Sequence, residues 1–305
     1  MKLKVATCQF PVEADSKKNL AYVLRQMKAA KNRGAHVAHF SEVCLSGYAG
    51  VDMESMQGFD WDLLQHAHRQ VAERARELKM WVVVGSAHRL SGRHKPHNSL
   101  YIIDDGGRLV ERYDKMFCVG DRSGKTNDLA HYSPGSHFSV FEIKGVRCGA
   151  QICHDFRYEE LYREYKKRKV QVMFHSYHNG HQSPAQFRQA CKVSVGQDRR
   201  WNLAANVHGI IVPPTMQAYA ANNHMWISSN NTSARESSWP SFVVRPDGVI
   251  TDHLQRNRAG ILITAIDPKK RYYDAAEAWR DRAMRGIFHS GRMVHDARSR
   301  NRTSL

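Results

Sequence analysis

The chain alternates between short apolar runs and longer amphipathic stretches, and this rhythm constrains its fold more than any other feature. Apolar runs of strand length occupy residues 2–10, 35–40 and 80–90. Between them, at 16–34 and 59–79, apolar residues recur at helical spacing. Strands that alternate with amphipathic helices are typical of layered α/β proteins, in which the sheets are buried on both faces. The sequence therefore predicts an α/β fold with helices over the sheets.

The remaining elements follow from the same patterns. We expect the first helix to be capped by Ser16 and to end at Gly34, because serine and glycine are common helix start and stop signals. Two apolar hairpins are predicted at 97–115 and 137–153. Further along, the patterns predict helices at Tyr158–Lys169 and 183–201, and strands at 170–176, 202–212, 241–250 and 259–267.

No proline- or serine-rich linker interrupts this pattern, so we expect one domain over residues 1–273. Residues 274–305 are rich in arginine and lack the strand rhythm. We expect them to form a basic arm that packs on the domain or on a partner subunit.

Composition narrows the class of protein. The N-terminus lacks the pattern of a signal peptide, and no apolar run approaches the ~20 residues needed to span a bilayer. The six cysteines contain no C-x-x-C pair, which argues against a disulfide framework and a zinc ribbon. We therefore expect a cytoplasmic protein without a membrane partner.

The formal charge of +17 raises a second possibility, a basic nucleic-acid-binding protein. The chain shows no RNA-recognition, zinc-finger or leucine-zipper signature. We therefore favour a solvated basic surface and expect no nucleic-acid partner.

Three reactive groups stand just beyond predicted strands. Glu42 follows the second strand, Lys115 ends the first hairpin, and Cys153 ends the second. Side chains at strand ends meet at one rim of a layered α/β fold. We therefore expect the three groups to lie together.

Together these groups could cleave a carbonyl–nitrogen bond. A thiol needs a base or a nearby cation, because it is mostly protonated at neutral pH. Glu42 could accept the Cys153 proton, and Lys115 could lower the thiol pKa and hold an oxyanion. The backbone N–H of His154 could be a second oxyanion donor if it lies at a helix start.

The same stretches resemble the nitrilase superfamily, the carbon–nitrogen hydrolases. The resemblance rests on "VATCQFPV", "SEVCLSGY", "HNSLYIIDDGGRLVERYDK", "YSPG", "GAQICHDFRYEE" and "VVRPDGVI". It implies that Glu42, Lys115 and Cys153 are catalytic, in an α-β-β-α sandwich that pairs with a second subunit into a four-layer homo-oligomer. It also implies that no cofactor or metal is needed.

Departures from the family pattern affect the surroundings of these residues. Ser41 replaces the usual proline before Glu42, and Asp128 is the nearest match to a second acidic residue found in many members. The order Cys153-x-Asp155-x-Arg157 resembles the amidase and carbamoylase branches more than true nitrilases. We expect Asp155 and Arg157 to fix the turn after the cysteine through ion pairs.

Polar residues near these motifs predict a polar pocket, with Tyr48, His178 and Asn179 as candidate lining residues. His175, His178 and His181 are spaced by three, which in a helix would suggest a metal site. The Asn179–Gly180 pair favours a turn, so we interpret these histidines as pocket lining.

The leading hypothesis is a thiol amidohydrolase that releases ammonia from a small amide or N-carbamoyl compound through an acyl intermediate on Cys153. A nitrilase or an acyltransferase with the same Glu-Lys-Cys centre is the enzymatic alternative. The basic nucleic-acid-binding protein is the alternative outside enzymology.

Overall fold

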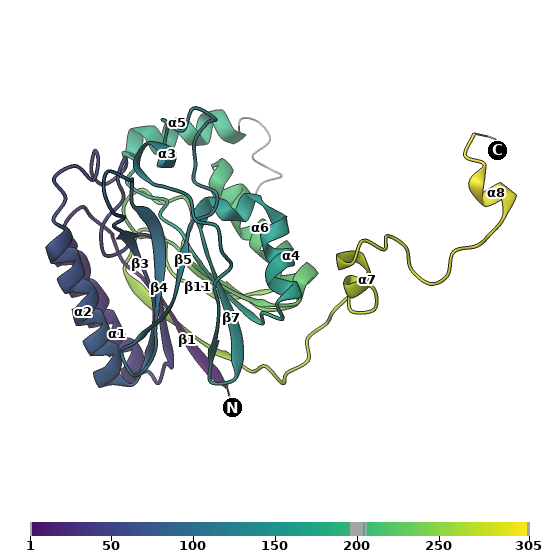
Figure 1. Cartoon of the computed structure of the whole chain (residues 1–305), viewed down its shortest axis with the longest axis horizontal. Helices are drawn as coiled ribbons and strands as arrows, with labels where there is room; N and C mark the ends of the chain where they lie inside the picture. The colour runs from purple at the N-terminus through teal and green to yellow at the C-terminus, as the bar shows by residue number, and fades with distance from the viewer. Residues whose placement is uncertain (1, 196–203, 205, 304–305) are drawn as a thin grey trace.

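Two six-stranded sheets pack face to face, and helices cover the outer face of each (Figure 1). This computed structural model describes residues 2–195, 204 and 206–303. Apolar residues fill the space between the two sheets and the space between each sheet and its helices. The predicted α-β-β-α sandwich is confirmed. Its pairing into a four-layer homo-oligomer stays a prediction.

The first sheet has the strand order β12-β1-β2-β3-β4-β5. Its strands β1, β2 and β3 are parallel, whereas β4, β5 and β12 join by antiparallel pairing. The strands are β1 (Leu3–Gln9), β2 (Val37–Phe40), β3 (Trp81–His88), β4 (His97–Ile103), β5 (Leu109–Asp114) and β12 (Gly260–Ile266).

The second sheet has the order β11-β10-β9-β8-β7-β6, with β7, β8 and β9 parallel. The strands are β6 (Val140–Ile143), β7 (Val146–Ile152), β8 (Val172–Ser176), β9 (Trp226–Asn230), β10 (Phe242–Val244) and β11 (Ile250–His253).

Helices α1 (Ser16–Asn32) and α2 (Trp61–Leu78) cover the first sheet, and α4 (Glu159–Lys167) and α6 (Val207–Asn223) cover the second (Figure 1). The shorter elements are α3 (Asp128–His131), a 3₁₀ turn (Cys153–Arg157), α5 (Pro184–Val195), α7 (Arg280–Met284) and α8 (Ala297–Arg300). In the part of the chain that the structure describes, no helix combines the length and the apolar character needed to cross a membrane.

Helix α1 shows how local sequence sets an element. Leu20, Val23 and Met27 lie on its buried face, one helical turn apart. Its cap is Asp15, whose carboxylate accepts from two backbone N–H groups of the first turn, so the predicted cap at Ser16 is wrong by one residue. Gly34 follows the helix with a φ of +77°, as a terminating glycine requires.

The strand predicted at 202–212 is wrong, because the chain forms helix α6 from Val207. The Asn206 side chain caps this helix by accepting from Gly209 N at 3.0 Å. The apolar run stops at Pro213 and Pro214, which are residues that usually end a helix. The sequence pattern therefore did not indicate that one helix continues through these prolines to Asn223.

Two other predictions differ from the structure. Strand β9 was missed because its polar residues disrupt the apolar pattern; Ser228, for example, is buried at the seam between the sheets and bonds Thr7 Oγ1 at 2.8 Å. Residues 241–250 form β10, a turn and the start of β11 rather than one strand. The helix predicted at 183–201 is present as α5, and its last predicted residues lie outside the described part of the chain.

After β12 the chain first packs on the body and then leaves it. Arg280 of α7 is buried, pairs with Asp274 and donates to Asn222 O at 2.8 Å. Beyond α7 the chain runs away from the sandwich to α8, and Phe288 is 87% exposed (Figure 1). The domain boundary near residue 273 and the packing of the arm on a partner subunit stay predictions.

The topology brings the ends of β2, β5 and β7 together. Because β4 is antiparallel to both β3 and β5, β5 runs in the same direction as β2 and β3. The chain after β2 also meets the second sheet, since Glu42 N donates to Tyr177 O at 3.3 Å. One rim of the sandwich therefore receives segments from both sheets.

Gly85 of β3 allows this rim to close. A Cβ at residue 85 would lie 2.3 Å from Ser41 O and 2.5 Å from Val43 N, far inside contact distance. We predict that Gly85→Ala lowers the free energy of unfolding by about 1–3 kcal/mol, because the backbone beside Glu42 must move. Urea unfolding measures this change.

The control is Gly106→Ala, at an exposed turn where the nearest atom to a new Cβ is the Asp104 carboxylate oxygen at 3.2 Å. We expect it to change stability by less than ~0.5 kcal/mol. Equal stability of Gly85→Ala and the wild type would contradict the prediction.

Candidate active site

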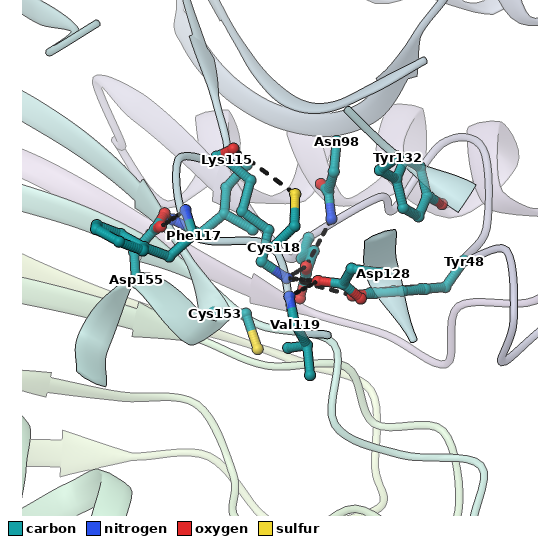
Figure 2. A network of polar contacts seen from close by, with 12 residues as sticks. Tyr48, Asn98, Lys115, Phe117, Cys118, Val119, Asp128, Tyr132, Cys153 and Asp155 are labelled. Carbon is teal, nitrogen blue, oxygen red and sulfur yellow. Dashed lines mark hydrogen bonds and ion pairs between the residues drawn. The ribbon is translucent and has the colours of Figure 1, made fainter. Parts of the chain in front are cut away.

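Lys115, directly after β5, is fully buried and lies between two carboxylates. Its Nζ is 2.9 Å from Glu42 Oε1 and 2.7 Å from Asp128 Oδ2. A third contact, at 3.3 Å, joins it to the Tyr48 hydroxyl. A buried ammonium is stable only when it is paired in this way. The structure thus brings together Lys115, Glu42 and the additional acid Asp128. Figure 2 shows Lys115 and Asp128 with the residues around them.

Each carboxylate has a further anchor. Asn98 Nδ2 donates to Glu42 Oε1 at 2.7 Å. Asp128 accepts from the Tyr48 hydroxyl at 2.5 Å and from Val119 N at 2.9 Å. Glu42 Oε2 is buried and has no partner of full hydrogen-bond geometry among the described residues. This oxygen is therefore the one available to receive a proton.

Cys153 comes from the opposite sheet and faces the same group of side chains (Figure 2). It is the first residue of the 3₁₀ turn after β7 and has a φ of +40°, which is rare for a residue with a side chain. Part of its surface is exposed, so it is not sealed in the core. A strained turn at the end of a strand presents a side chain toward the rim.

Asp155 holds this turn in place. Its carboxylate accepts from the Tyr113 hydroxyl at 2.7 Å, Phe117 N at 2.8 Å and Ile152 N at 3.0 Å. Burial raises the pKa of Asp155 to about 6, although these hydrogen bonds by themselves lower it. The prediction of an ion pair is wrong here, because Arg157 instead lies 4.7 Å from the Phe156 ring centre and pairs with no carboxylate in the described chain.

The charges keep Cys153 protonated. Burial raises the pKa of the Cys153 thiol well above its ordinary value, and the Glu42 carboxylate raises it further by its charge and by hydrogen bonding. The Lys115 ammonium lowers the pKa of the thiol, but the two negative charges of Glu42 and Asp128 outweigh its single positive charge. A thiolate would be a third negative charge beside one cation. Cys153 is therefore a neutral thiol at rest.

Lys115 stays charged for the complementary reason. Burial alone lowers the pKa of its ammonium, but Glu42 and the other negative partners outweigh burial and raise that pKa well above its ordinary value. For Asp128, burial raises the pKa, but Lys115 and the hydrogen bonds outweigh it and lower that pKa. The group at rest is two carboxylates, one ammonium and one neutral thiol.

A cavity of about 510 Å³ reaches this group of side chains at Cys153 and Asp128. The predicted pocket residues Tyr48, His178 and Asn179 all line it, as do Cys153 and His154. His154 is the second residue of the 3₁₀ turn, and the first N–H groups of a helix have no partner inside it. The predicted oxyanion donor is therefore beside the thiol.

His175 lies away from this cavity wall, so the three histidines do not form one set. Its Nε2 is 3.2 Å from Cys153 O and its Nδ1 is 2.8 Å from the Tyr162 hydroxyl. Burial lowers its pKa to about 3, so it is a neutral residue of the core.

One residue of the site was missed by the sequence analysis. Asn98 holds Glu42, yet it lies in a stretch that we interpreted only as an apolar strand. The sequence offered no local signal for this contact, because Glu42 and Asn98 are 56 residues apart.

A larger hollow, of about 930 Å³, lies between α4 and α7. Among the described residues, its wall contains no cysteine, serine or threonine, and its basic residues are mixed with Asp274, Glu277 and Asp281. Its basic residues are Arg147, Lys166, Lys167, Lys169, Arg280 and Arg285, with His224 beside them. That the protein has no nucleic-acid partner stays a prediction.

Comparison with known proteins agrees with this geometry. The family described as "Carbon-nitrogen hydrolase" matches residues 4–273. The chain belongs to the carbon–nitrogen hydrolase family. This match confirms the resemblance that the motifs indicated.

Characterised members of the carbon–nitrogen hydrolase family match parts of the chain. The deaminated glutathione amidase of Yersinia enterocolitica is 29% identical over 178 residues, which cover 55% of this chain and 60% of that protein. The omega-amidase NIT2 of Bos taurus is 25% identical over 173 residues, covering 56% and 61%. The matched stretch thus spans about three fifths of these relatives.

A solved member shares the fold. An amidase from Nesterenkonia AN1, as a cysteine-to-alanine variant, has a TM-score of 0.70 and 18% identity, covering 93% of this chain and 96% of that one. In another variant of that amidase (TM-score 0.69, 18% identity, covering 87% and 90%), the acetamide moiety of fluoroacetamide is covalently added at the active-site cysteine.

The charge arrangement leads to a test of the thiol. Glu42→Gln removes a negative charge beside Cys153, so the thiol pKa should fall. We predict that alkylation of Cys153 by iodoacetamide at pH 8 becomes roughly 10-fold faster, because a pKa lower by one gives ten times more thiolate. Mass spectrometry of the peptide containing Cys153 measures the rate.

The matched control is Glu164→Gln, a surface residue of α4 that pairs with Lys167 and Arg168. It should leave the alkylation rate of Cys153 unchanged. An unchanged or slower rate in Glu42→Gln would show that Glu42 does not suppress the thiolate.

Proposed function

We propose that this chain is a thiol amidohydrolase that cleaves the C–N bond of a small amide or N-carbamoyl compound and releases ammonia. The observation that carries the proposal is a cysteine on the cavity wall whose thiol lies beside a buried carboxylate, Glu42, and a buried ammonium, Lys115. The amidase names of the relatives support amide substrates, and the solved amidase whose active-site cysteine carries the acetamide moiety of fluoroacetamide supports a nucleophilic cysteine.

In the first step Cys153 Sγ attacks the substrate carbonyl carbon, and its proton passes to Glu42. This general-base role suits a thiol whose pKa is raised, because the proton has to leave as the S–C bond forms. Glu42 Oε2 is free to receive it, while Asn98 and Lys115 hold Oε1.

The resulting oxyanion would be held by Lys115 Nζ and the His154 N–H. All three Nζ hydrogens already have partners, and the contact with Tyr48 is the longest at 3.3 Å. The substrate oxygen therefore replaces Tyr48 as the third partner of Lys115. Two donors aimed at an oxyanion are the usual source of barrier lowering in acyl transfer.

Collapse of the tetrahedral intermediate breaks the C–N bond, and Glu42 returns its proton to the leaving nitrogen. Ammonia departs and a thioester to Cys153 remains. Water then attacks the thioester carbon and gives a proton to Glu42. The acid product leaves, and the proton returns to the Cys153 sulfur. Asp128 keeps Lys115 charged and oriented throughout.

Ammonia release from a panel of small amides and N-carbamoyl compounds tests the proposal. We expect Cys153→Ala to lower kcat by at least about 10³-fold, because Cys153 is the one cysteine among the described residues that line the cavity. Cys191→Ala, on α5, is the control and should keep full activity. Full activity in Cys153→Ala would reject the mechanism, and turnover of nitriles or amine acceptors instead of amides would favour the nitrilase or acyltransferase alternative.

The cavity also indicates the charge of the substrate. Burial, then neighbouring cations, lower the pKa values of His154 and His208, so both rings are neutral at pH 7. Among the described residues that line the cavity, Arg157 carries the guanidinium, whereas the Glu42–Lys115–Asp128 group carries a net negative charge. We propose that the substrate presents an anionic group to Arg157.

This charge gives a second kinetic prediction. We expect Arg157→Ala to raise KM for amides that carry a carboxylate by on the order of 10-fold, since one charged hydrogen-bonded contact is worth ~1.5–3 kcal/mol. Uncharged amides should keep their KM, and Arg157→Lys should restore most of the affinity. An equal loss for charged and uncharged amides would contradict an anion-binding role.

A further inference from the structure

Asp52, His178 and His181 form a cluster that the proposed reaction does not use. His178 Nε2 and His181 Nε2 each lie 3.0 Å from Asp52 Oδ1. The three atoms all lie within 4.8 Å of one another. The cluster joins the turn after Tyr48 to the segment after β8, so it connects loops from the two sheets. We propose that these three residues form a binding site for one divalent transition-metal ion, Zn²⁺ being the best match.

The spacing of the three atoms fits shared coordination. Zinc binds imidazole nitrogen at ~2.0–2.1 Å and carboxylate oxygen at ~2.0–2.2 Å, so two ligands on one tetrahedral ion are about 3.3 Å apart. The two nitrogen–oxygen separations of 3.0 Å are close to that value. Two imidazoles and one carboxylate are a common ligand set for zinc and for other first-row divalent ions.

Without an ion, hydrogen bonds fill the cluster. His178 Nε2–H donates to Asp52 Oδ1 at 3.0 Å, and His181 Nε2–H donates to Val12 O at 2.6 Å. A metal ion would take the place of these two protons, and the His181 ring would turn its Nε2 from Val12 O toward Asp52 Oδ1, which is 3.0 Å away. His178 Nδ1 is buried and has no partner among the described residues, so it can carry the ring proton when Nε2 binds the ion.

The surroundings suit a metal ligand set. Asp52 Oδ2 accepts from Tyr48 N at 2.8 Å, which orients the carboxylate and leaves Oδ1 toward the histidines. Such outer contacts are typical around metal-binding carboxylates. The His181 side chain is 31% exposed, whereas those of Asp52 and His178 are buried, so an ion can enter from the His181 side.

Binding there would affect the cavity wall. The backbone N–H of Tyr48 donates a hydrogen bond to Asp52, and its hydroxyl donates one to Asp128. His178 lines the cavity. The ion would thus tie two cavity loops together without touching a substrate. The inference does not depend on the proposed amidase activity.

The test measures metal binding directly on the full chain after treatment with a chelator. We expect the wild type to bind one Zn²⁺ in competition with a chromogenic chelator, and one Co²⁺ with the intense visible absorption of a tetrahedral site. At Zn²⁺ 100-fold above Kd, the unfolding midpoint should rise by on the order of 5 °C. His181→Gln should weaken Zn²⁺ binding by on the order of 100-fold and remove the Co²⁺ spectrum.

Controls separate this site from ordinary surface histidines. His94→Gln, an exposed histidine outside the cluster, should bind Zn²⁺ like the wild type. Asp52→Asn keeps the shape of the side chain and should weaken binding as His181→Gln does. His181 is partly exposed, so we expect its variant to fold, and its midpoint in chelator should equal that of the wild type.

Equal Zn²⁺ affinity and stoichiometry in the wild type and His181→Gln would overturn the site. So would a wild type that shows neither the Co²⁺ spectrum nor a Zn²⁺-dependent rise in its midpoint. In either case the cluster would be a hydrogen-bonded one. Neither result would bear on amide hydrolysis, which the ammonia assay tests separately.

Discussion

The rest of the site depends on one buried cation held between two carboxylates. Removing Lys115, Glu42 and Asp128 from water is costly, and only their mutual contacts at 2.7–2.9 Å make the burial tolerable. The same contacts fix the positions of all three side chains before a substrate arrives. The net negative charge of this group keeps Cys153 protonated, as the proposed proton transfer to Glu42 requires. The same charge arrangement thus makes the burial of these three side chains possible, fixes their positions and keeps the thiol protonated.

The turn that presents Cys153 depends on a second buried acid. Its left-handed backbone conformation is unfavourable for a residue with a Cβ. Asp155 offsets this cost, because its carboxylate collects three hydrogen bonds from β5, from the segment after Lys115 and from the end of β7. The position of the thiol is therefore fixed by contacts across the two sheets rather than by the turn alone.

Much of this arrangement could be predicted from the sequence, and the failures have physical causes. Glu42, Lys115 and Cys153 were recognisable because each follows an apolar strand, and strand ends converge at one rim. Helix α6 was missed because Pro213 and Pro214 interrupt its apolar run, and β9 because it is a buried strand with serines at the seam. The partners of Asp155 and the role of Asn98 depend on distant segments meeting in space. Local pattern contains no information about such contacts, and neither does it reveal that Asp52 lies beside His178 and His181.

The site draws its parts from both halves of the sandwich, with Glu42 and Lys115 just after strands β2 and β5 of one sheet and Cys153 just after β7 of the other. Any fluctuation that parts the two halves would separate the sulfur from the acid and the amine before either half lost its own pairing. Under the proposed mechanism, a molecule still folded by most spectroscopic criteria would then be inactive. Turnover would in that case report on the seam between the layers more sensitively than secondary-structure content does.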